Sequence, residues 1–146
     1  MMHADRFTLR GLVLVLLLFS IAGLVPELIL LEHYDDWEQW IPLVMLALSL
    51  ASTLVFWRRP SPGTLKTFRI IMVLCVVAGA LGLYYHFVGN LEFALERNPS
   101  LGKLALAWKA LRGATPALAP GALAQVGLLG LVYAFRHPAG GGNETV

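Results

Sequence analysis

Four stretches of the chain are each apolar enough and long enough to cross a lipid bilayer, and this constrains the fold most. A helix needs about 20 mostly apolar residues to cross a hydrocarbon layer of roughly 30 Å. The stretches run from Gly11 to Leu31, Trp40 to Trp57, Ile70 to Val88 and Thr115 to Phe135. Backbone polar groups in lipid must be satisfied within each segment. The sequence therefore predicts an all-α, integral-membrane four-helix bundle over residues 1–138, followed by a flexible tail, 139–146.

The composition supports a membrane protein and excludes several other classes. Of the 146 residues, 58% are hydrophobic and 14% are charged, against roughly 45–50% and about 25% in a soluble domain. Cys75 is the only cysteine, so a disulfide scaffold is excluded. The net charge of +2, with no long basic run, gives no reason to expect nucleic acid as a partner. The expected surroundings are the lipid bilayer.

The distribution of basic residues predicts how the spans are oriented. Seven Lys and Arg residues fall on one side and four on the other, and the short link between the first two spans has none. That link instead carries the acidic residues Glu32, Asp35, Asp36 and Glu38. Since basic residues concentrate in cytoplasmic loops, we expect a multi-pass protein of the cell inner membrane with both termini cytoplasmic.

The longer outer segment predicts a short amphipathic helix between spans three and four. Pro99 breaks the chain, and apolar residues then recur at helical spacing at Leu101, Leu104, Ala105, Trp108 and Leu111. Such a helix, over about 101–111, is typical of a segment that lies in the membrane interface. The alternative is a lid over an outward-facing cavity.

Polar residues within the spans are the strongest candidates for a binding site, because burying them in lipid is unfavourable. Glu27 follows Pro26 and shares a small, polar stripe with Gly23 and Ser20. On span three, Cys75, Gly79, Gly82, His86 and Asn90 share one face. We expect Glu27 and His86 to point into the bundle at similar depth and, with Asn90, to bind a proton, an ion or a polar ligand. A purely structural hydrogen-bonded pair is the alternative.

The outer mouth carries further side chains of the kinds that bind metals. Glu32 and Asp36 are one helical turn apart, His33 is next to Glu32, and Glu92 lies six residues beyond His86. Imidazole and carboxylate groups suit a divalent ion such as zinc or manganese. Glu32, His33, Asp36, His86 and Glu92 are therefore candidate metal ligands, with a solvated acidic loop as the alternative.

In architecture alone, the four spans and the carboxylate in the first span resemble the small multidrug transporters, which work as dimers. That family's motif is absent around Glu27, and the outer segment here is longer. No phosphate-binding loop or nucleophile elbow occurs either.

Three functions remain open from the sequence. The first is a small inner-membrane protein with an outward-facing pocket that binds an ion, metal or small ligand for transport or sensing. The second is a structural or assembly subunit of a larger membrane complex, and the third is a metal-assisted membrane enzyme. A homo-oligomer or a larger complex is the expected assembly.

Overall fold

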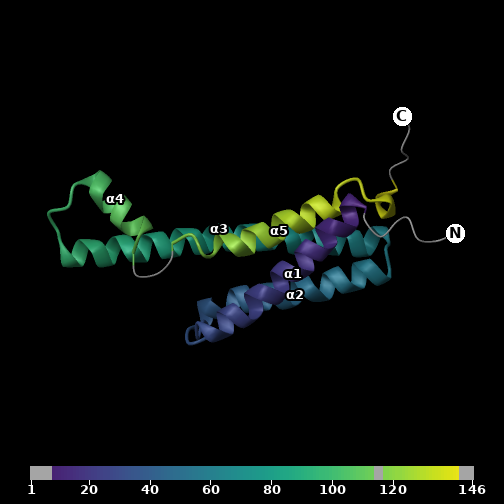
Figure 1. Cartoon of the computed structure of the whole chain (residues 1–146), viewed down its shortest axis with the longest axis horizontal. Helices are drawn as coiled ribbons and strands as arrows, with labels where there is room; N and C mark the ends of the chain where they lie inside the picture. The colour runs from purple at the N-terminus through teal and green to yellow at the C-terminus, as the bar shows by residue number, and fades with distance from the viewer. Residues whose placement is uncertain (1–7, 114–116, 142–146) are drawn as a thin grey trace.

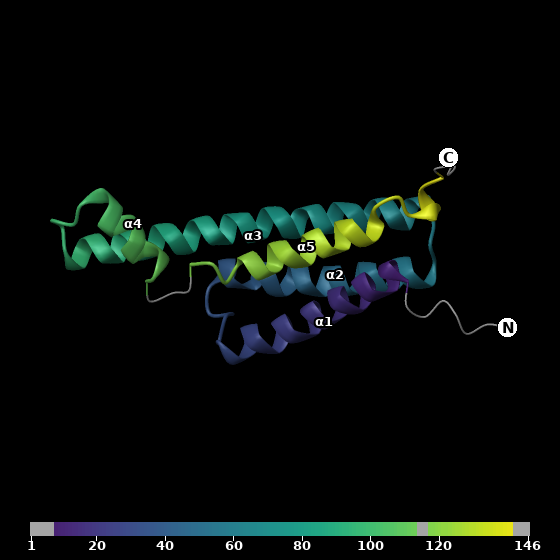
Figure 2. The ribbon, with the colours of Figure 1, turned by 45° about the horizontal axis from the view of Figure 1, so that its top comes forward.

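The computed structural model describes residues 8–113 and 117–141, and within them the protein is helical, with no strand. The all-α prediction is confirmed. In chain order, the elements are α1 (Leu9–Leu30), a 3-10 turn (Trp37–Gln39), α2 (Trp40–Arg58), α3 (Pro62–Arg97), α4 (Lys103–Leu111), α5 (Gly121–Ala134) and a second 3-10 turn (Pro138–Gly140). Helices α1, α2, α3 and α5 run side by side, as Figures 1 and 2 show.

Three of the helical segments are long and apolar enough to cross a membrane. They are Leu9–Leu30, Trp37–Arg58 and Pro62–Arg97. Helix α5 has 14 residues, which is about 21 Å and shorter than a hydrocarbon core of roughly 30 Å. The start of the fourth predicted span, Thr115, lies outside the described residues. Three of the four predicted spans are thus found as helices of sufficient length, and the fourth is not.

Helix α3 is much longer than its predicted span of Ile70 to Val88. It begins at a capping box, in which the Thr64 amide donates to Ser61 Oγ (3.2 Å) and the Ser61 amide donates to Thr64 Oγ1 (3.0 Å). It ends at Asn98, because the residue before Pro99 is disfavoured in the helical region. The fall in hydropathy after Val88 ends the apolar stretch but gives the backbone no reason to leave the helix.

The N-terminal end of α1 and the C-terminal end of α5 meet at one end of the bundle, here called the N/C end (Figure 1). Arg10 donates to the carbonyls of Phe135 (3.3 Å) and Arg136 (3.2 Å), and Arg69 donates to the Ala134 carbonyl (2.8 Å). These guanidinium groups satisfy carbonyls that a helix C-terminus leaves without partners. The two ends of the described chain therefore lie on the same side.

Near these arginines, at the N/C end, a cluster of aromatic rings connects α2, α3, α5 and the segment after α5. Phe56 stacks on Phe68 with ring centroids 5.4 Å apart, and Tyr133 meets both rings edge-on. The His137 ring lies 4.7 Å from that of Phe56. The next residues, Pro138–Gly140, form a 3-10 turn that packs against α3, so the predicted flexible tail begins later than residue 139.

Glycines bring α3 and α5 into close contact. A Cβ atom at Gly79 would lie 2.5 Å from the Ala124 amide nitrogen, and one at Gly127 would lie 2.9 Å from the Val76 amide nitrogen. Backbones approach this closely only where side chains are absent. On the same α3 face, the thiol of Cys75 is buried and lies 3.0 Å from Ser49 Oγ of α2. The predicted small-residue stripe of this helix therefore packs inside the bundle.

Beyond the bundle, the end of α3 and α4 form a projecting helical hairpin, which we call the arm (residues 89–113; Figure 2). Helix α3 has 36 residues and α2 has 19, and the difference amounts to about 25 Å at 1.5 Å per residue. Helix α4 folds back on the end of α3. The sequence predicts a helix over about 101–111 that lies in the membrane interface. The helix is present as α4, but it packs on the end of α3 in a hairpin, because α3 itself continues beyond its predicted end.

Candidate functional site

At the end of the bundle opposite the N/C end, here called the far end, His33 and His86 lie together. Their ring centroids are 6.3 Å apart and the ring planes are inclined by 45°. Both residues are half-buried. His86 comes from α3 and His33 from the link after α1, so two candidates separated by more than 50 residues in sequence meet in space.

The way in which α1 ends places His33 in this position. The His33 amide donates to the Leu28 carbonyl (2.9 Å) and the Glu32 amide donates to the Ile29 carbonyl (3.0 Å). Glu32 adopts a left-handed conformation with φ of 52°. This pair of bonds around a left-handed residue is a Schellman motif, in which glycine usually takes the position of Glu32. The motif turns the chain back over the end of the helix.

The surroundings of His33 make its imidazole harder to protonate. Partial burial lowers the pKa of His33, and the charge of His86 lowers that pKa further. Two imidazolium groups at this distance would repel each other. The pair therefore favours a neutral His33, whose ring nitrogen can accept a hydrogen bond or coordinate a metal ion.

Glu27 does not lie inside the bundle, so its predicted orientation is wrong. It is exposed, and a Cβ atom added to Gly23 would meet nothing within 4 Å. The buried face of α1 is formed instead by Leu17 and Ile21, with Leu24, Val25 and Leu28 packed beside them. Bulky apolar side chains bury more surface than the small residues of the stripe, so α1 turns the former toward its neighbours and leaves the latter uncovered.

Asn90 is buried, as a binding residue on the predicted stripe would be, but its side chain faces α4. Its side-chain amide donates to the Ala110 carbonyl of α4 (3.0 Å). Gly113 packs against the same side chain so closely that an added Cβ would overlap it. Asn90 therefore positions α4 on α3.

The five candidate metal ligands do not assemble into one site. Among the described residues, no group of three or more His, Cys, Asp or Glu side chains could hold a metal ion. Glu32, Asp36 and Glu92 are exposed. Glu92 follows His86 by six residues, and at 100° per residue it points to a different face of α3. Of the predicted set, the structure brings together only the two histidines.

The sequence analysis missed a second cluster, at the N/C end. Arg10, Arg69 and His137 come from three different segments and lie close enough to interact. Burial lowers the pKa of His137, and the two guanidinium charges lower it further. No spacing in the sequence reveals this cluster, because only the packing of α5 between α1 and α3 brings the three residues together.

Comparisons with protein-family models, with curated proteins and with solved structures give no match for this chain.

Proposed function

We propose that the protein is an assembly subunit of the inner membrane, which packs against a partner helix in the same bilayer through one face of α1. That face consists of Ser20, Gly23 and Glu27. The observation that carries this proposal is the exposure of Glu27 on a helix long and apolar enough to span the membrane. A carboxylate that faces lipid is unfavourable, and a neighbouring protein surface with a polar group relieves that penalty.

The surroundings of Glu27 suit contact with another helix better than contact with lipid. The space around Gly23 is open to 4 Å and beyond, so a second backbone can approach this side of α1 closely, as small residues allow in membranes. Glu27 is three residues before the end of α1, about 4–5 Å along the axis. Its carboxylate thus lies near the membrane boundary, within reach of a polar group on a partner.

In this proposal the chain crosses the membrane four times, with both termini in the cytoplasm. Support for the fourth crossing comes from the contacts of α5 and its flanks along α3. They extend from Pro120, beside Gly82, to Gly140, beside Leu65. The 17 residues of α3 between these contacts correspond to about 26 Å, close to the thickness of a hydrocarbon core. The excess of basic residues at the N/C end favours the cytoplasm for that side.

Site-specific photo-crosslinking in intact membranes tests the lateral contact. A photoreactive residue replaces Gly23 in one variant and Ala22 in a matched control, which is also exposed but points about 100° away around the helix. We expect a discrete crosslinked band from position 23 and none from position 22. A band of twice the chain mass identifies a second copy, and any other discrete mass identifies a different subunit. Equal or absent crosslinking at both positions would contradict the proposal.

A second candidate function, ligand binding for transport or sensing, is favoured by the approach of His33 to His86. Two imidazoles with centroids 6.3 Å apart can share a proton or contribute two ligands to a divalent ion, with water completing its coordination. Isothermal titration of Zn²⁺ into the purified protein tests this. We expect binding that His86→Gln abolishes and His137→Gln preserves, and identical titrations of the two variants would exclude the histidine pair as the site.

A further inference from the structure

Helix α4 packs on α3 through a face different from the one that its apolar pattern suggested. Ala110 is fully buried, and Leu106 and Ala107 are half-buried. By contrast, Leu104, Trp108 and Leu111 are 86%, 61% and 44% exposed. Their spacing of four and three residues places them on one face. Leu106, Ala107 and Ala110 thus pack within the arm, and Leu104, Trp108 and Leu111 are left uncovered.

The charges on α4 indicate what covers this face. Residues 101–113 contain the basic residues Lys103, Lys109 and Arg112 and no acidic residue. The Arg112 guanidinium lies over the Trp108 ring, 5.8 Å from its centroid. A helix with Trp and Leu on one face and Lys and Arg beside them is typical of segments that lie on anionic lipid surfaces.

The C-terminal end of α4 lies close to the end of the third predicted span. The bond from Asn90 to the Ala110 carbonyl fixes the C-terminal end of α4 two residues beyond Val88, where the predicted span ends. Two residues correspond to about 3 Å along the helix axis. The headgroup region adds several ångströms to each side of the hydrocarbon core, so Trp108, Leu111 and Arg112 lie within reach of it.

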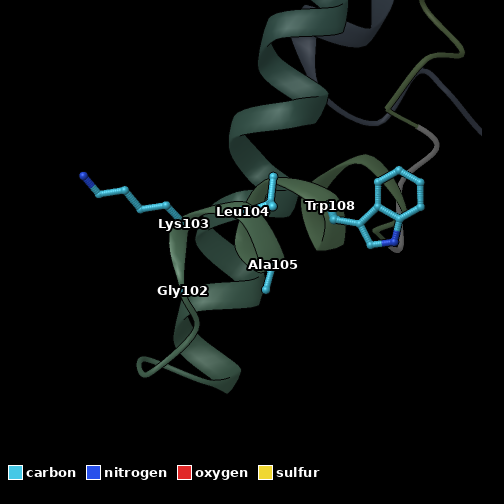
Figure 3. A pocket seen from close by; sticks show the side chains of 5 residues that line it. All are labelled: Gly102, Lys103, Leu104, Ala105 and Trp108. Atoms are coloured by element: carbon cyan, nitrogen blue, oxygen red, sulfur yellow. The ribbon is translucent and has the colours of Figure 1, made fainter.

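An open surface hollow at α4 is also mainly apolar, with a basic residue at its edge. It is lined almost wholly by apolar atoms of Gly102, Lys103, Leu104, Ala105 and Trp108, and its volume is about 750 Å³. Lys103 and Trp108 extend to opposite sides of the helix in Figure 3. An apolar floor with a cation at its edge is suited to the upper part of a phospholipid, whose acyl chain begins next to a phosphate.

From these observations we propose that α4 is an anionic-lipid-binding helix. Its Leu104, Trp108 and Leu111 side chains enter the membrane interface at the far end, and Lys103, Lys109 and Arg112 pair with lipid phosphates. The ligand class is the anionic phospholipid of a bilayer surface. This binding site is separate from the α1 face, and neither proposal depends on the other.

Spin-label accessibility in nanodiscs tests the proposal on the full-length protein. A nitroxide is attached at Ala105→Cys, on the exposed side of α4, and at Ser100→Cys as a matched control in the preceding turn, since Cys75 is buried. We expect the label at 105 to be shielded from a water-soluble relaxation agent in discs with 30% phosphatidylglycerol but not in pure phosphatidylcholine. The label at 100 should be accessible in both.

The basic residues provide the decisive variants. Each Lys or Arg near an anionic surface changes the ratio of docked to undocked helix by about fivefold. Replacing Lys103, Lys109 and Arg112 by Gln should therefore restore accessibility at position 105, and 0.5 M salt should do the same for the unaltered helix. All three side chains are exposed, so circular dichroism should show an unchanged helix content.

Three results would overturn the assignment. The first is equal accessibility at position 105 in both lipid compositions. The second is equal shielding in both, which would mean docking without a role for lipid charge. The third is shielding that persists in the phosphatidylglycerol discs after Lys103, Lys109 and Arg112 are replaced by Gln, which would mean that these basic residues do not bind the lipid.

Discussion

The glycine contact between α3 and α5 offers the sharpest test of how the two helices pack. Helix α3 also contains a control glycine that is not in contact with another helix. A Cβ at Gly79 would lie 2.5 Å from the Ala124 amide nitrogen, 2.8 Å from Ala124 Cβ and 2.9 Å from the Pro120 carbonyl oxygen. Two of these three atoms belong to the backbone of α5 or its preceding turn, so they cannot yield without displacing that segment. Gly89 lies on the same helix, and a Cβ there would meet nothing within 4 Å.

The loss of stability from overpacking is measured as the difference in the free energy of unfolding between Gly79→Ala and Gly89→Ala. Both substitutions gain the helix propensity of alanine over glycine, up to about 1 kcal/mol. Only Gly79→Ala also overpacks the interface, which lowers the free energy of unfolding by about 1–3 kcal/mol. Because the propensity gain is common to both, the difference between the two variants isolates the overpacking. Gly130→Ala should have a smaller effect than Gly79→Ala, since its nearest neighbours belong to the flexible Met72 side chain.

Unfolding by SDS titration in mixed micelles, followed by circular dichroism, measures these differences. We expect Gly89→Ala to match or exceed the parent protein and Gly79→Ala to unfold at a lower SDS fraction. Equal stability of the two variants would refute the close approach of α3 and α5, and with it the position of α5 in the bundle.

Further outcomes concern topology, pH and the N/C end. A thiol reagent added from outside should label Asp35→Cys and miss Ser61→Cys, and the reverse pattern would invert the orientation. Since burial and His86 lower the pKa of His33 below its ordinary value of 6.5, the folded state binds fewer protons than the unfolded state, and stability at this site falls as pH drops through that value. The protection factors of amides in the α1–α2 link, which correct hydrogen exchange for its intrinsic pH dependence, should therefore be lower at pH 5 than at pH 7.5, and His86→Gln should reduce that difference. Arg69→Gln removes a charged hydrogen bond to the end of α5 and should lower the free energy of unfolding by about 1.5–3 kcal/mol, measured by the same SDS titration. An unchanged midpoint would show that the bond contributes nothing.

Hydropathy and length were enough to predict the helices that can span a membrane. The first two predicted spans match α1 and α2 closely, because a long apolar run bounded by polar residues has few other solutions in lipid. The extent of α3 was not predictable from hydropathy, since its last nine residues are polar enough for water and remain helical. The signal that ends the helix, Asn98 before Pro99, is local and was visible in the sequence.

Which of the candidate site residues meet depends on contacts between segments that are distant in the sequence. Such contacts are harder to predict from the sequence than the helices themselves. His33 meets His86 because a Schellman motif turns the chain, and the motif uses Glu32 where a glycine would have signalled it. Asn90 lies on the predicted stripe, but α4 covers it. The periodicity of a stripe gives the residues that share a face and contains no information about which neighbour covers that face.

The small-residue faces of this chain illustrate that limit and sharpen the functional proposal. The stripe of α3 is covered by Ala124 of α5 at Gly79 and by Ala110 of α4 at Asn90. The stripe of α1 has the same small residues and a carboxylate in addition, yet the structure leaves it open at Gly23. If this face met lipid alone, the ionised carboxylate of Glu27 would have no polar protein group beside it, which is unfavourable even near the membrane boundary. This contrast between a covered stripe on α3 and an open, charged stripe on α1 is what the proposed partner helix accounts for.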